Sequence, residues 1–162
     1  MKYFTKEWCF GEIDDCKIEA LSKSYKKYIN NIYEKLPFVL KLLSRNINLH
    51  DGRLMKAIFN HEENSLLLEA VCGDLQSKYY FLEIKYYGIY NLKDKVLMSI
   101  FKNQEIEILS DEIEFFSDEY FSHKMFFSSM KDIDIRFKDL QIIFRSATSN
   151  EYKKCLCLFE VI

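Results

Sequence analysis

The chain has 162 residues, 49% of them apolar and 30% charged, which is enough apolar material for one folded core and too little bias for a disordered or fibrous protein. Four Gly and one Pro exclude a Gly-rich phosphate-binding loop, a flexible linker and a proline-rich recognition segment. The formal net charge of −2 argues against a general nucleic-acid or anionic-membrane binder, because both rely on clustered Lys and Arg.

The N-terminal residues 1–8 lack the apolar stretch and the small-residue cleavage site of a signal peptide. No apolar run approaches the roughly 18 residues that a membrane-spanning helix needs. Five Cys, an odd number, are more typical of reduced thiols than of a disulfide framework. We therefore expect a cytoplasmic protein with no membrane contact, folded as a single domain over residues 1–162.

Helices are expected first, over about residues 12–45. Apolar residues from Ile18 onward recur at intervals of three and four, which predicts an amphipathic helix that Asp14 or Asp15 caps. Pro37 interrupts this helix and suits the first turn of a short second one that continues through Leu43. The helix residues expected to face the sheet are Leu21, Tyr25, Tyr28 and Ile32.

Strands are expected from about residue 53 to the end. Short apolar runs at 54–59, 66–71 and 79–87, separated by turn residues, predict an antiparallel meander. A short helix capped by Asn91 is expected to interrupt the strands. Further strands are expected around Ile106 and Ile108 and at residues 113–116, 120–127, 133–137, 140–144 and 154–161. The fold class is α+β, with a helical hairpin packed on a curved, mainly antiparallel sheet of six to eight strands.

Charge is distributed unevenly along the chain. Residues 1–60 carry 11 basic and 7 acidic side chains, and the remaining residues carry 12 basic and 18 acidic ones. Residues 103–123, which we call the acidic segment, contain seven carboxylates and no Lys or Arg. The carboxylates are Glu105, Glu107, Asp111, Glu112, Glu114, Asp118 and Glu119.

The acidic segment has two interpretations, a solvated face and a binding surface for a basic protein. Aromatic residues between the carboxylates, Phe116 among them, would supply burial at such a surface, while the carboxylates would select a basic partner. We expect these carboxylates to be exposed, so that replacing Glu112, Glu114 and Glu119 with Gln leaves the fold intact and slows association with the partner. A pair of these acids could also serve glycoside hydrolysis, but Glu105 and Glu107 have the spacing of a solvated strand edge.

A small hydrolase is the alternative function. His50 and Asp51 are adjacent, and Cys72 would be its nucleophile if the fold brought a His close to it. Gly52 follows directly, however, and Asp-Gly before a strand is typical of a turn.

Metal binding is not indicated. The three His have no ligand spacing, and Cys155 and Cys157 are separated by one residue, where a zinc knuckle needs two. On a strand these two Cys share one face, which favours a pair of small core residues. We expect neither a metal nor another cofactor.

Several stretches resemble a family of uncharacterised bacterial proteins, a domain of unknown function that opens with a segment like residues 1–8. The matching stretches are Leu36-Pro37, residues 48–52, residues 72–75 and the strand at 106–112 with its Asp111-Glu112. The resemblance covers about residues 1–145, leaves residues 146–162 unplaced and implies no activity. The succession of His, Asp, Gly and a meander is also similar in style to small immunity proteins that neutralise bacterial toxins, an analogy of architecture only.

Three functions therefore stay open. The leading hypothesis is a non-enzymatic module that binds a basic protein, such as a toxin or nuclease domain, through the acidic segment. The second is the hydrolase built on His50, Asp51 and Cys72, and the third is a structural domain without a dedicated site.

Overall fold

The computed structural model describes residues 1–162 except 77, 102–103, 118 and 154–155, and it confirms the α+β fold class. Its helices are α1 (Lys6–Cys9), α2 (Asp15–Ile32), α3 (Phe38–Arg45), α4 (Asp94–Phe101) and α5 (Ser149–Lys153), with a 3-10 turn at Tyr33–Lys35. Its strands are β1 (Gly52–Asn60), β2 (Ser65–Asp74), β3 (Lys78–Tyr87), β4 (Glu107–Phe115), β5 (Phe121–Phe127), β6 (Asp132–Phe137), β7 (Asp139–Ser146) and β8 (Leu158–Val161).

The helix boundaries follow from capping chemistry. The Asp14 carboxylate accepts a hydrogen bond from the Lys17 amide at 2.9 Å, so Asp14 is the N-cap of α2. Pro37 is the N-cap residue of α3, where its missing amide proton costs nothing. Helix α1 was not expected from the periodicity, because it is a single turn held by a Thr5 cap.

The eight strands form one sheet in the order β6-β5-β4-β1-β2-β3-β7, with β8 pairing in parallel alongside β1. The expected meander is β1, β2 and β3. The two strands expected at 106–108 and 113–116 are one continuous strand, β4, with a register shift between Ile108 and Ser110. Strand β8 covers Leu158–Val161, the second half of the strand expected at 154–161, and α5 ends before that range, at Lys153.

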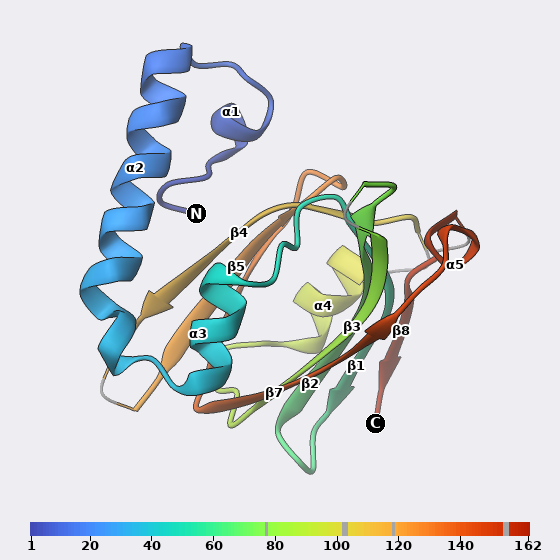
Figure 1. Cartoon of the computed structure of the whole chain (residues 1–162). Helices are drawn as coiled ribbons and strands as arrows, with labels where there is room; N and C mark the ends of the chain where they lie inside the picture. The colour runs from blue at the N-terminus through green and yellow to red at the C-terminus, as the bar shows by residue number, and fades with distance from the viewer. Residues whose placement is uncertain (77, 102–103, 118, 154–155) are drawn as a thin grey trace.

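The sheet curls strongly. Strands β6 and β7 lie at opposite ends of the strand order, yet only Lys138 separates them in the chain, so the two edges converge at this point. Helix α3 lies across the mouth of the curve, as Figure 1 shows. A small cavity there is lined by Leu40 of α3, Phe137 of β6 and Leu140 of β7.

The core fills the concave side of the sheet. Helix α4 buries Leu97, Ile100 and Phe101 in it, and α3 buries Leu40 and Leu43. No helix among the described residues combines the length and the apolar character needed to cross a membrane.

The sheet-facing residues of α2 differ in part from the expectation. Tyr25, Tyr28 and Ile32 pack against the core, but Leu21 does not belong to the core cluster, and the fully buried residue of α2 is Ile29. In Figure 1, α2 stands beside the curved sheet, next to β4 and the N-terminal segment.

Candidate functional sites

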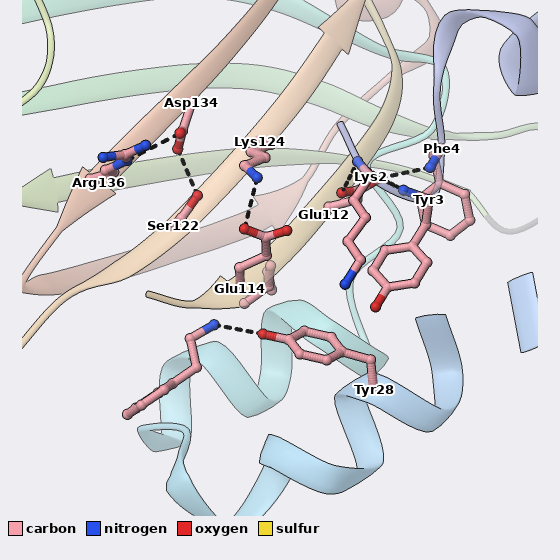
Figure 2. A network of polar contacts seen from close by, with 12 residues as sticks. Lys2, Tyr3, Phe4, Tyr28, Glu112, Glu114, Ser122, Lys124, Asp134 and Arg136 are labelled. Atoms are coloured by element: carbon pink, nitrogen blue, oxygen red, sulfur yellow. Dashed lines mark hydrogen bonds and ion pairs between the residues drawn. The ribbon is translucent and has the colours of Figure 1, made fainter. Parts of the chain in front are cut away.

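Carboxylates of the acidic segment meet cations that come from other strands. The Arg53 Nη2 atom of β1 lies 2.7 Å from the Glu107 Oε1 atom. The Lys124 Nζ atom of β5 lies 2.7 Å from the Glu114 Oε2 atom, and both side chains are about four-fifths buried. Figure 2 shows this second pair on the face of the β4–β5 hairpin. Part of the negative charge that is unbalanced along the sequence is therefore balanced in space.

The exposed carboxylates of the acidic segment lie near its two ends. Glu105, before β4, is exposed. Glu119, in the turn after β4, has 74% of its side chain exposed, and the Lys138 Nζ atom lies 3.5 Å from its Oε2 atom. Phe116 in the same turn is also exposed, whereas Asp118 lies outside the described residues. The described part of this segment is not a continuous acidic surface.

Glu112 is fully buried and holds the N-terminal segment against β4. Its carboxylate accepts hydrogen bonds from the backbone amides of Lys2, Tyr3 and Phe4, at donor–acceptor distances of 2.6–3.1 Å. Figure 2 shows the three amides directed at this one carboxylate. The expectation that Glu112 is an exposed residue whose replacement leaves the fold intact is wrong, since its buried charge is satisfied by these donors.

Most of β4 lacks a neighbouring strand on one side. Strand β1 pairs with β4 only at Gly52 and Arg53, so the backbone of β4 beyond Ile108 turns to side chains for its hydrogen bonds. The Tyr25 hydroxyl of α2 accepts from the Ile113 amide at 2.7 Å, and the Tyr28 hydroxyl accepts from the Phe115 amide at 3.0 Å. These contacts pair amides that would otherwise form an open sheet edge.

His50 and Asp51 lie in the turn before β1, as Asp-Gly predicted, with Asp51 at a positive φ of 60°. The His50 Nδ1 atom lies 2.7 Å from the Leu109 carbonyl oxygen, and its Nε2 atom lies 3.5 Å from the Asp51 carboxylate. Both residues line a cleft of about 410 Å³ together with Tyr79, Tyr152 and the end of β2.

Cys72 does not reach that cleft. It is fully buried, and burial raises the pKa of its thiol from 9.0 to about 12. A Cβ atom at Gly52 would lie only 2.7 Å from the Cys72 Sγ atom, so the chain passes directly over the thiol and needs Gly there. A nucleophilic Cys needs the opposite environment, in which the pKa is lowered and the sulfur is accessible. The three residues of the hydrolase hypothesis thus lie near one another without forming a nucleophilic site.

A buried hydrogen-bonded chain links Tyr86, His123 and Asp111, and sequence reasoning missed it. The Tyr86 hydroxyl lies 2.6 Å from His123 Nδ1, and His123 Nε2 lies 3.1 Å from Asp111 Oδ2. Because an ionised carboxylate only accepts, the assignment that satisfies all three groups has Nε2–H donating to Asp111 and the Tyr86 hydroxyl donating to Nδ1. Burial raises the pKa of Tyr86 well above 10.0, so its hydroxyl stays protonated and keeps the proton that it donates to His123.

Cys157 is fully buried before β8, but Cys155 lies outside the described residues, so the predicted pair on one strand face is described only in part. In the part of the chain that the structure describes, no group of three or more His, Cys, Asp or Glu side chains is arranged to hold a metal ion.

Aromatic and cationic side chains gather on the surface where the β4–β5 turn meets β6 and the loop after β3. We call Tyr90, Phe116, Tyr120, Arg136 and Lys138 the tip cluster. The Tyr90 ring lies 4.5 Å from Tyr120 and 6.5 Å from Phe116, measured between centroids. The Arg136 guanidinium stacks 4.1 Å from the Phe116 centroid, and the Lys138 ammonium lies 5.1 Å from that of Tyr120. Of these five residues, the sequence indicated only Phe116 and Tyr120, as aromatic residues within the acidic segment.

No protein-family model matches this sequence, and searches of curated proteins and of solved structures return no significant match. These comparisons neither confirm nor contradict the resemblance to the uncharacterised bacterial family.

Proposed function

We propose that this chain is a protein-binding module whose contact surface is the tip cluster. The observation that carries the proposal is the exposure of two large aromatic side chains within an ordered arrangement: 48% of Tyr90 and 46% of Phe116 are exposed. Tyr and Arg are enriched among the residues that dominate binding energy at protein interfaces.

The tip cluster is already ordered before any partner binds. The Arg136 Nε atom donates to the Asp134 carboxylate at 3.1 Å, and its Nη1 atom donates to the Tyr90 hydroxyl at 3.5 Å. Three segments that are distant in sequence hold one another in place there. Binding therefore costs little side-chain entropy, which favours affinity.

The proposal keeps a protein partner and drops the requirement that the partner be basic. Most described carboxylates of the acidic segment have cations or backbone amides as partners, and the cluster itself carries Arg136 and Lys138. The sequence suggested a toxin or nuclease domain as the partner. Binding of such a domain to the tip cluster can be tested. The hydrolase is not favoured, because the Cys72 thiol is buried.

The test compares cross-linked capture from the source cells by three versions of the protein. Phe116→Ser removes one anchor of the tip cluster, and Ile143→Ser removes an apolar residue of β7 that is even more exposed, at 59% against 46%. We expect a protein that the unmodified chain and Ile143→Ser both capture and that Phe116→Ser captures at least about tenfold less well, as the loss of a central anchor predicts.

Equal capture by Phe116→Ser and Ile143→Ser, or capture by none of the three, would contradict the proposal. A fourth version, Glu119→Gln, addresses the charge of the partner, because weaker and less salt-sensitive capture is expected only for a basic partner.

A further inference from the structure

A cavity of about 670 Å³ lies between the N-terminal segment, α2 and α3, well separated in the chain from the tip cluster. One wall is aromatic: the Phe4 ring packs 4.7 Å from Trp8 and 4.9 Å from Tyr25, measured between centroids. Ile29 of α2 completes the apolar part of the lining. The volume lies in the range of clefts that bind a small organic molecule.

Two cations line the same cavity from different helices. Lys26 projects from α2 and makes no hydrogen bond or ion pair within the described part of the chain. Arg45 at the end of α3 donates to the Asn30 side-chain oxygen at 2.7 Å and stacks 3.6 Å from the Tyr33 centroid, which fixes its guanidinium. Since a guanidinium has five N–H donors, Arg45 keeps donors for an anion.

The described lining contains no His, Cys or carboxylate. The Ser22 hydroxyl donates to the Ile18 carbonyl and the Ser44 hydroxyl to the Lys41 carbonyl, each at 3.0 Å. The Tyr25 hydroxyl accepts from the Ile113 amide of β4. With these hydroxyls engaged in local structure, the cavity is suited to hold a molecule and not to transform one.

We propose that this cavity binds a small organic anion, a flat aromatic body carrying one carboxylate, sulfonate or phosphate group. The aromatic wall receives the body by stacking and burial, and Lys26 and Arg45 receive the anionic group. The basic surplus of residues 1–60, 11 basic against 7 acidic side chains, attracts such a ligand to this part of the molecule.

Trp8 makes the proposal directly measurable, because it is the single Trp of the chain and lines the cavity. The probe is anilinonaphthalene sulfonate, an aromatic anion whose emission rises in apolar surroundings, and the matched neutral probe is phenylnaphthylamine. We expect one molecule of the sulfonate to bind per folded chain, with energy transfer from Trp8. The neutral probe should bind at least about threefold more weakly, the effect of losing one partly exposed charge contact.

Matched variants identify the site. Lys26→Gln should weaken sulfonate binding about threefold and leave the neutral probe unaffected, whereas Lys27→Gln, the same change at an exposed neighbour outside the lining, should change neither. Ser22→Phe, which fills the cavity from α2, should abolish energy transfer from Trp8.

The proposal is overturned if the sulfonate does not bind, if it binds no better than the neutral probe, or if Lys26→Gln and Lys27→Gln behave alike. It is also overturned if a folded Ser22→Phe protein still transfers energy from Trp8 to the probe. The lysine pair decides the question even where Ser22→Phe does not fold.

Discussion

Glu112 and Glu119 belong to the same hairpin region, but their surroundings have opposite consequences for stability. Glu112 is fully buried and accepts from three backbone amides, whereas Glu119 projects into solvent with Lys138 3.5 Å away. Removing the acceptor for a buried donor costs more than removing an exposed ion pair. The two residues thus form a matched pair for mutation.

We expect Glu112→Gln to lower the free energy of unfolding by about 2–3 kcal/mol, because the uncharged amide accepts the three N–H bonds poorly and places its own NH₂ group against them. Urea denaturation measures the change. Glu119→Gln, the control, should leave the denaturation midpoint unchanged. Equal midpoints for both variants would show that the Glu112 contacts do not stabilise the protein.

For individual residues, the sequence shows where charged side chains gather along the chain, but it does not show which residues they contact. The carboxylates of the acidic segment are visible as a run, but Arg53, Lys124 and the amides of residues 2–4 come from elsewhere in the chain. The turn at Asp51-Gly52 was predictable because its signal is local. The partners of Glu112 were not, because they are 108–110 residues away.

Helix α2 protects the edge of strand β4 that has no neighbouring strand. The helix presents two tyrosine hydroxyls to consecutive outward amides of β4, at Ile113 and Phe115. Helix amphipathicity predicted correctly that Tyr25 and Tyr28 face the sheet. It could not predict that their hydroxyls accept hydrogen bonds from β4 amides, because periodicity reports only where apolar surface lies.

The Tyr28→Phe variant tests this pairing. Its missing hydroxyl leaves the Phe115 amide without its acceptor, so we expect that amide to exchange with deuterium faster than its neighbours and the protein to lose about 1 kcal/mol of stability. Hydrogen exchange followed by NMR measures the effect at single residues. The control is Tyr87→Phe, whose hydroxyl donates to Gln141 at the surface. Unchanged protection of Phe115 in Tyr28→Phe would rule out the pairing.

The elements themselves were largely predictable. The capped helix α2, the break at Pro37 and the β1–β2–β3 meander all carry local signals and were confirmed. Merging of two expected strands into β4 was not predictable from local signals, since the partners of Asp111 and Glu112, His123 and the N-terminal amides, come from other segments of the chain.

For the whole molecule, burial of weak acids predicts a loss of stability at alkaline pH. Burial raises the pKa of Cys72 from 9.0 to about 12 and also raises the pKa values of Tyr25 and Tyr86 above 10.0. These groups stay protonated in the folded protein and ionise first in the unfolded chain. Their contribution is therefore complete below about pH 9 and falls as the pH rises toward about 12.

We expect the urea midpoint of the unmodified protein to decrease steadily between about pH 8.5 and pH 11. The decrease with pH should be shallower in Cys72→Ala, whatever the midpoint of that variant at neutral pH. The comparison of slopes separates the thiol from the surface lysines, which titrate alike in both proteins. Parallel slopes would mean that Cys72 ionises equally in the folded and unfolded states.

The overall shape was predictable only as a class. Alternating strands and early helices indicate α+β, but the curl that joins β6 to β7 through Lys138 and the parallel pairing of β8 with β1 depend on contacts between distant segments. The cavity beside Trp8 arises from the same kind of packing, where α1, α2 and α3 meet.

The bond between Lys2 and Glu112 spans 110 residues, which affects the order of events during synthesis. At about 5–20 residues per second, the ribosome adds Glu112 roughly 5–20 s after Lys2. Until then the N-terminal segment has no acceptor, and the tyrosines of α2 have no strand to cover. Contacts between residues so far apart also slow folding of the complete chain. The residues that are made first are therefore among the last to reach their final positions.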